Sequence, residues 1–243
     1  MYLNLSAISK ICLSTLTLIL LPLSFTFDNI MAQTINFRPP SGAAPKTTTG
    51  AATRDSSCLI DSSRTDQKFS QTLPILPKSN YGLTFSERPA FPIFKTKTSA
   101  KQVFLSLESE DGENVYQNFL PLTTEVGFIT INFPQDAPNL VINKKYKWTM
   151  AFICGKMLKP DSPSISGWIQ QVPKSQSLSA KLKSASPVDR IAVYGENGIW
   201  YDMINELNQL KKQNPSNQTL SSAWDKLIKD HVVQQTKSAT QNK

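Results

Sequence analysis

Histidine and the short motifs of common catalytic sites are almost absent from this sequence. The 243 residues contain one histidine, His231, and none of the motifs G-x-S-x-G, H-E-x-x-H and G-x-x-x-x-G-K. General acid–base catalysis by histidine is therefore not expected. Paired carboxylates for glycoside hydrolysis stay an open alternative, because the fold sets their separation. We predict a protein that is not an enzyme and uses no cofactor.

Long apolar runs are also absent, with one exception near the start. Residues 11–23 read ICLSTLTLILLPL and follow a stretch with one basic residue and no acid, and Ala32 offers a small residue for cleavage. This is the three-part pattern of a secretory signal over residues 1–32. The run is short for a membrane span, which needs about 20 residues. We predict export to the periplasm or the cell exterior, with no integral membrane span after cleavage; an uncleaved anchor is the alternative.

Cysteine is scarce, and only three cysteines occur in the chain. Cys12 falls within the apolar run, which leaves Cys58 and Cys154 after cleavage. An even count in an exported chain predicts a disulfide between them, and two unpaired thiols are the alternative. Closing a loop of this length stabilises a fold by roughly 4–5 kcal/mol in chain-entropy estimates. Two cysteines and one distant histidine do not supply a closed zinc shell, so we predict no metal site.

Clusters of basic residues are missing, although the net charge is +8. Such a charge suits nucleic acid, anionic lipid or acidic polysaccharide, or it marks a solvated basic surface. The lysines are scattered and do not alternate with aromatic residues, so we expect no nucleic acid partner. Four acids form either a calcium loop or a solvated hairpin tip: Glu108, Glu110, Asp111 and Glu113.

The segment after the signal, residues 33–65, is rich in Pro, Gly, Ser and Thr and has almost no large apolar residue after Phe37. Such a composition buries too little surface to offset the entropy of ordering, so we predict a disordered leader. Its end is anchored by Cys58. At the other end of the chain, residues 233–243 are predicted to be a disordered tail.

Residues 66–173 contain short apolar runs separated by turn residues, which predicts an antiparallel β-sandwich of the immunoglobulin or fibronectin III type. The clearest strand is 145–154, where aromatic and apolar residues alternate with polar ones and place Cys154 on the buried face. Tyr146 follows Leu140 by six residues, a spacing that resembles the tyrosine corner of such sandwiches. Further strands are predicted at 103–107, 115–119, 126–133 and 165–172, with a hairpin turn at Asp111-Gly112.

Residues 174–232 change to a helical period. Ser186 and Pro187 suit the start of a helix that ends near Gly195, and a shorter helical turn precedes them at 178–183. Apolar stripes then recur over 199–210 and 220–228. The pattern resembles one and a half tetratricopeptide repeats. The alternative is that the helices pack against the sandwich. We predict an α+β fold with a C-terminal helical hairpin region.

Four segments resemble a family of exported cyanobacterial proteins that is defined only as a domain of unknown function. They are LTFSERPAFPIF, VINKKYKWTMAFICG, SGWIQQV and YGENGIWYDMINELNQL. The shared features are Glu87-Arg88-Pro89 before an aromatic strand, the strand with Tyr146 and Trp148 that leads to Cys154, and the helix start at 198–202. The resemblance covers roughly residues 58–228. It implies a location and an architecture, and it brings no established activity.

We predict a non-enzymatic binding or protein-interaction module, with the sandwich as scaffold and the helical region as docking surface. The alternative is a binder of cell-envelope polysaccharide that uses lysines and exposed Trp168, Trp200 or Trp224 as a stacking surface. The helical stripes predict, in contrast, that Trp200 and Trp224 are buried. Glu87-Arg88-Pro89 either locks a local ion pair at a strand entry or presents its charged pair to a partner.

Overall fold

The structure, a computed structural model, describes residues 35–40, 57–63 and 70–241, with side chains described up to residue 230. The chain divides into two units, Met1–Met31 and Ala32–Lys243, and every described residue belongs to the second. The predicted signal and most of the predicted leader lie outside the described residues. Among the helices that the structure describes, none is long and apolar enough to cross a membrane.

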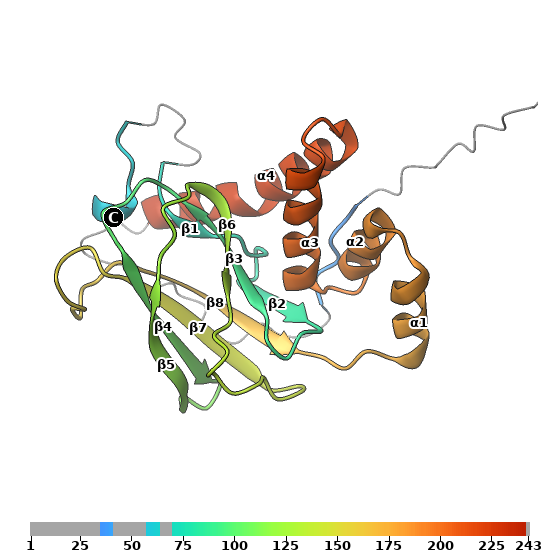
Figure 1. The fold of residues 1–243 in the computed structure, drawn as a ribbon, viewed down its shortest axis with the longest axis horizontal. Helices are drawn as coiled ribbons and strands as arrows, with labels where there is room; N and C mark the ends of the chain where they lie inside the picture. The colour runs from blue at the N-terminus through green and yellow to red at the C-terminus, as the bar shows by residue number, and fades with distance from the viewer. Residues whose placement is uncertain (1–34, 41–56, 64–69, 242–243) are drawn as a thin grey trace, which may run out of the picture. The chain divides into compact units, whose positions relative to one another are not determined.

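The larger of two sheets has five strands in the order β2-β8-β7-β4-β5 (Figure 1). Neighbouring strands are antiparallel except β2 and β8, which run parallel. Four of the strands match predicted ones; β2 does not, because four residues are too few to show a period of two. The strands are β2 Tyr81–Thr84, β4 Gln102–Ser109, β5 Asn114–Pro121, β7 Lys145–Phe152 and β8 Ser164–Gln171.

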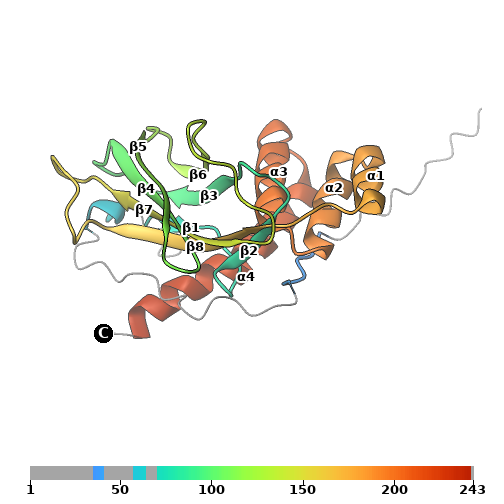
Figure 2. The same cartoon turned by 90° about the horizontal axis from the view of Figure 1, so that it is seen from below.

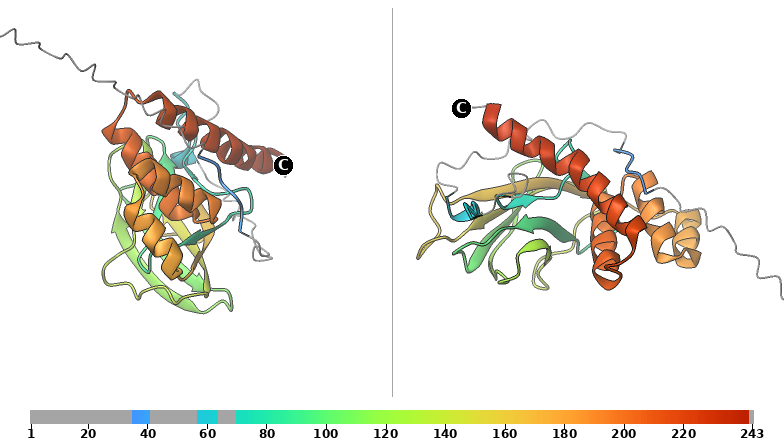
Figure 3. Two further views of the ribbon diagram at one scale, coloured as in Figure 1. Left: turned by 90° about the vertical axis from the view of Figure 1, so that its right-hand side faces the viewer. Right: turned by 90° about the horizontal axis from the view of Figure 1, so that it is seen from above.

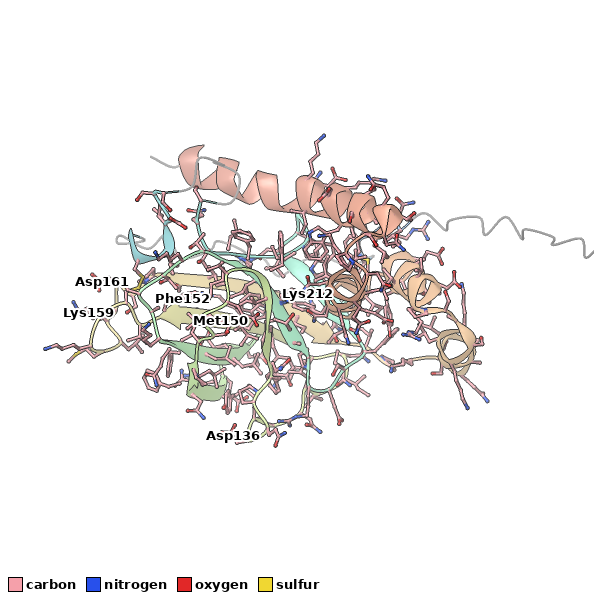
Figure 4. All side chains as sticks on the ribbon, turned by 45° about the horizontal axis from the view of Figure 1, so that its top comes forward. Asp136, Met150, Phe152, Lys159, Asp161 and Lys212 are labelled. Atoms are coloured by element: carbon pink, nitrogen blue, oxygen red, sulfur yellow. A yellow bond between two sulfur atoms is a disulfide. The ribbon has the colours of Figure 1, made fainter. Side chains whose placement is uncertain are left out.

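The smaller sheet has three antiparallel strands in the order β1-β3-β6. They are β1 Leu73–Pro74, β3 Ala90–Lys95 and β6 Gly127–Asn132. The two sheets meet through their inward side chains, and the ring of Phe91 on β3 lies 5.1 Å from that of Trp148 on β7. Met150 and Phe152, labelled in Figure 4, belong to the same core. Buried and half-exposed side chains alternate along β7, which confirms the half-buried strand that the sequence predicts at this place.

The mixed α+β class is confirmed, and one detail of the predicted sandwich is present. The hydroxyl of Tyr146 accepts a hydrogen bond from the backbone nitrogen of Val141 at 3.2 Å. This is the bond back across the connection that the tyrosine-corner spacing predicts. The parallel pairing of β2 with β8 departs from the expected antiparallel arrangement.

Four helices follow the strands: α1 Gln176–Ser184, α2 Pro187–Glu196, α3 Trp200–Gln213 and α4 Gln218–Gln241. The predicted start at Ser186 and Pro187 is confirmed, since the hydroxyl of Ser186 accepts a hydrogen bond from the backbone nitrogen of Asp189 at 3.2 Å. Gly198 turns the chain between α2 and α3 with φ +72°. The backbone of α4 continues to Gln241 where the sequence predicts a disordered tail, because no glycine or proline interrupts 218–241.

The helices pack against the sheets rather than forming a repeat of their own. Phe128 points outward from β6, and its ring lies 4.6 Å from that of Trp224 on α4. Figure 3 shows α4 extending alongside the sheets. A second apolar cluster joins α1 and α2 to the chain beyond β2 (Figure 2), and its buried members are Phe85, Leu182, Val193 and Ile199. The helical region thus completes the core, as the alternative to the repeat arrangement predicts.

A short part of the predicted leader is ordered against the helices. Ile35 is buried, the ring of Phe37 lies 4.7 Å from that of Trp200, and the backbone nitrogen of Arg38 donates to the carbonyl of Gly195 at 2.9 Å. The composition argument for disorder does not hold for residues 35–40. These residues carry Ile35 and Phe37, two of the few large apolar side chains of the leader.

Candidate functional site

The predicted disulfide joins Cys58 and Cys154, whose α-carbons lie 6.1 Å apart. Cys58 belongs to the short 3-10 helix Ser57–Leu59. Cys154 lies two residues beyond the end of β7 and is half-buried, so it is not a strand residue as the sequence predicts. Cys58 is half-buried as well, and a bonded pair of this kind fits an exported protein because disulfides persist in oxidising compartments.

The tryptophans predicted as a sugar-stacking surface are buried, and that prediction is wrong. Trp168, Trp200 and Trp224 are 4%, 0% and 3% exposed. The prediction that Trp200 and Trp224 are buried is confirmed. The indole nitrogen of Trp200 donates to the carbonyl oxygen of Ile75 at 2.8 Å, which satisfies its polar group inside the core.

Arg88 of the Glu87-Arg88-Pro89 segment makes local contacts, but they are hydrogen bonds to a neighbouring loop and not the predicted ion pair. Its guanidinium donates to the carbonyl oxygen of Ala137 and the side-chain oxygen of Asn139, both at 2.9 Å, and also to the carbonyl oxygen of Pro134. It also lies over the ring of Phe133, 5.6 Å from the centroid. Arg88 thus fixes the loop that follows β6.

The acids at the tip of the β4–β5 hairpin face lysines. Glu110 lies 3.5 Å from the ammonium of Lys145, and Glu113 lies 3.8 Å from that of Lys144. No group of three or more His, Cys, Asp or Glu in the described part of the chain could hold a metal ion. The ion pairs at the tip are exposed, and such pairs contribute little to stability.

A groove of about 610 Å³ between β6 and α3 is the strongest candidate for a binding site. One wall is the polar stripe of α3, which comprises Asn205, Asn208, Gln209, Lys212 and Gln213. These positions follow the i, i+3, i+4, i+7, i+8 spacing, so all five lie on one face of the helix. The opposite, apolar face of α3 is buried in the core. Lys212 is labelled in Figure 4.

The other wall and the rim come from the sheet. Thr130 and Asn132 point outward from β6 because Ile129 and Ile131, which alternate with them, are buried. Thr123 and Glu125 line the groove from the loop between β5 and β6. Polar side chains thus meet on two elements that are far apart in the sequence.

Asn205 positions the helix wall against the sheet. Its amide nitrogen donates to the carbonyl oxygen of Ala90 at 2.8 Å, and its oxygen accepts from the hydroxyl of Thr130 at 3.1 Å. The nitrogen and the oxygen of this side-chain amide therefore both have hydrogen-bond partners within the protein. The side-chain amides of Asn132, Asn208 and Gln209 make no hydrogen bond to another described residue, so they are available to a ligand.

Asp202 holds the start of α3 against β2. Its carboxylate accepts a hydrogen bond from the hydroxyl of Thr84 at 2.7 Å and from the backbone nitrogen of Phe85 at 3.1 Å. Burial raises the pKa of this carboxyl above its ordinary value, and the two hydrogen bonds act in the opposite direction. Asp202 lies three residues before Asn205, on the same side of α3 as the groove wall, and its carboxylate serves to position the start of the helix.

The groove is suited to binding an uncharged polar ligand. Its lining contains one acid, Glu125, and one base, Lys212, and its other polar members are amides and hydroxyls. An amide offers donors and an acceptor together, which matches peptide groups and sugar hydroxyls. The single carboxylate does not supply the pair that glycoside hydrolysis requires.

Sequence reasoning overlooked this groove, although half of it is visible in the sequence. The amide stripe lies on the same helix as the apolar stripe at 199–210. The apolar positions predict the helix, and the polar positions between them indicate its second face. The wall formed by β6 could not be predicted from the sequence, because it lies beside α3 only through the long-range packing of the sheet.

Comparisons with known proteins give a family and little else. The model of a family described as Domain of Unknown Function (DUF928) matches residues 49–242. No curated protein matches the chain. Among solved structures, the adhesin domain of Epf from Streptococcus pyogenes is similar, with 18% identity over 39% of this chain and 32% of that one and a TM-score of 0.25. The likeness therefore spans about a third of the adhesin domain, and it bears on neither fold nor function.

Proposed function

We propose that this chain, which belongs to the family of unknown function that matches residues 49–242, is an exported non-enzymatic binding module. The observation that supports the proposal is the amide-lined groove. Two elements present unpaired amides to the same space, and the lining lacks a catalytic pair of carboxylates. We propose an extended, uncharged polypeptide segment as its ligand.

The choice of a peptide over a glycan rests on the lining. Sugar rings are commonly held by stacking on aromatic faces, and none of the residues that line the groove is aromatic. The tryptophans that could have supplied such a face are buried. Amides can instead pair with the backbone groups of an extended peptide, which presents a donor and an acceptor at every residue.

The proposal includes the finer architecture and the location. The hydrogen bond between Tyr146 and Val141 supports an immunoglobulin or fibronectin III-like sandwich. The parallel pairing of β2 with β8 differs from the antiparallel pairing of such a sandwich. Export with cleavage after Ala32 is supported by the disulfide. Mass spectrometry of the exported chain should find Gln33 at its start, and a chain that still begins at Met1 would contradict this part.

The groove is tested with a double variant, Asn208→Ala with Gln209→Ala. Labelled full chain is applied to a pool of short uncharged peptides and to an array of purified oligosaccharides. The parent chain should select peptides, and the double variant should bind them roughly tenfold or more weakly, because two hydrogen bonds are lost. Gln176→Ala, at an exposed amide on α1, is the matched control and should leave binding unchanged.

The outcomes separate the alternatives. Peptide binding that the double variant does not weaken would place the ligand elsewhere on the molecule. Selection of an oligosaccharide, with the same sensitivity to the double variant, would replace the peptide with a glycan. Melting curves of both variants should match the parent chain, because the mutated side chains lie at the surface.

A further inference from the structure

The exposed edge of the five-stranded sheet, strand β5, has no described partner on its outer side. β5 is last in the sheet order and pairs only with β4 (Figure 1). The backbone nitrogen of Leu122 donates to the carbonyl oxygen of Lys101. Hydrogen-bonded positions alternate along an antiparallel strand, so the backbone groups of Leu120 and Asn118 also face β4. The backbone groups of Gln117 and Phe119 therefore point away from the sheet.

Natural proteins usually protect such an edge with charged side chains, a proline, a β-bulge, a short strand or a covering element. The eight residues of β5, NVYQNFLP, contain no charge, and Pro121 is the last of them. Phe119 is 48% exposed. In the described part of the chain, one contact blocks an outward backbone group: the side-chain oxygen of Asn118 accepts from the nitrogen of Phe119 at 2.8 Å.

The strand is held ready for pairing by contacts on its two faces. On one face, Asp136 accepts hydrogen bonds from the hydroxyl of Tyr116 and the amide of Asn118, each at 3.0 Å (Figure 4). On the other face, the rings of Phe104 and Phe119 lie 5.0 Å apart. These contacts hold the strand extended, so an added strand would meet a preorganised partner once the Asn118 side chain leaves the nitrogen of Phe119.

We propose that β5 pairs with β5 of a second copy of this chain, in an antiparallel arrangement that joins the two five-stranded sheets. Antiparallel pairing of one strand with itself satisfies the two-fold symmetry of a homodimer. Around the symmetry axis, the outward backbone groups of Gln117 and Phe119 from each copy exchange hydrogen bonds with those of the other, once the nitrogen of Phe119 leaves the side-chain oxygen of Asn118.

The charge distribution favours a second copy over another partner. The chain carries a net charge of +8, so two copies that meet over most surfaces would repel each other. β5 is an uncharged stretch of eight residues within that basic chain. An acidic partner would find no complementary charge on it, whereas an identical strand meets it without repulsion. This proposal is independent of the ligand proposed for the groove.

Sedimentation velocity of the full chain, from micromolar to millimolar concentration, measures the association. We expect a monomer–dimer equilibrium, because one pair of strands buries a small area and the Asn118 contact must open. Gln117→Lys places like charges across the symmetry axis and should weaken the dimer by roughly tenfold or more. Gln176→Lys makes the same change of charge on α1 and should leave the dimer intact.

Amide signals of the parent chain, recorded by NMR over the same concentrations, locate the interface. Those of Gln117 and Phe119 should shift as the dimer forms. Three results would overturn the proposal. They are a monomer at all concentrations, a dimer that both lysine variants weaken equally or neither weakens, and concentration-dependent shifts that lie outside β5.

Discussion

The two edges of the five-stranded sheet are protected in different ways. At the β2 edge, helices and the segment after β2 cover a strand of four residues, and a β-carbon added at Gly82 would lie 2.9 Å from the β-carbon of Trp200. At the β5 edge, a strand of eight residues carries no charge, and no helix in the described part of the chain covers it. The helical region therefore covers the β2 edge of the sheet and does not cover the β5 edge.

Removal of the helices should have the largest effect. Truncation after Pro173 uncovers β2 and the outward side chains of the smaller sheet, among them Phe128. An apolar face of this size causes aggregation, so the truncated chain should be insoluble or non-cooperative in unfolding. Light scattering and thermal denaturation check this. A soluble truncated chain that melts like the parent would show that the helices are a separate docking unit.

Substitution of one aromatic residue at each edge sharpens the comparison. Trp200→Ala should lower the free energy of unfolding by about 3–5 kcal/mol, because it opens a cavity and leaves the carbonyl of Ile75 without its donor. Phe119→Ala should cost about 1 kcal/mol or less, since this ring is half exposed. Urea denaturation measures both, and equal losses would contradict the contrast between the edges.

The disulfide stabilises the molecule independently of either edge. Cys154→Ser should lower the free energy of unfolding by about 2–5 kcal/mol, because the bond restricts the unfolded chain. Cys58→Ser removes the same bond and should have the same effect. Peptide mapping without reductant should recover one linked pair. Two thiols that alkylate freely in the unfolded, unreduced chain would refute the pairing.

The sequence predicts the strands and helices that repeat a period clearly. The strand at 145–152 and the helix start at Ser186 are confirmed because side-chain alternation and end capping are local properties. β1 and β2 are too short to show a period, and Pro92 interrupts the pattern of β3. Sheet order and the parallel pairing of β2 depend on long-range packing, which a single sequence does not encode in its spacing.

The candidate groove could be predicted only in part, for the same reason. The polar positions from Asn205 to Gln213 repeat a helical period and could have been recognised as a second stripe on α3. Thr130 and Asn132 carry no comparable signal, since outward polar residues are common on strands. The mistaken choice of Trp168 as a stacking residue has a related cause, because the sequence does not show what covers an outward side chain.

The smallest expected effect concerns Asp202 at the β2 edge and appears as a dependence on pH. Because burial raises the pKa of this carboxyl in the folded protein, the folded state binds the proton more tightly than the unfolded chain. The resulting stabilisation is fully present below the unfolded pKa, about 3.9, and is lost as the pH rises through the folded pKa. The free energy of unfolding of the parent chain should therefore fall relative to that of Asp202→Asn as the pH rises from the unfolded pKa through the raised folded pKa.

Thr84→Val provides the second arm of this experiment. The hydroxyl of Thr84 donates to the carboxylate of Asp202 at 2.7 Å and favours its charged form. Removal of the hydroxyl should raise the pKa of Asp202 further and make the loss of stability with rising pH larger. Urea denaturation at a series of pH values measures all three chains. Curves for the parent and Asp202→Asn that stay parallel over the whole range would show that Asp202 keeps its ordinary affinity for the proton, and that the cover over the β2 edge does not depend on its charge.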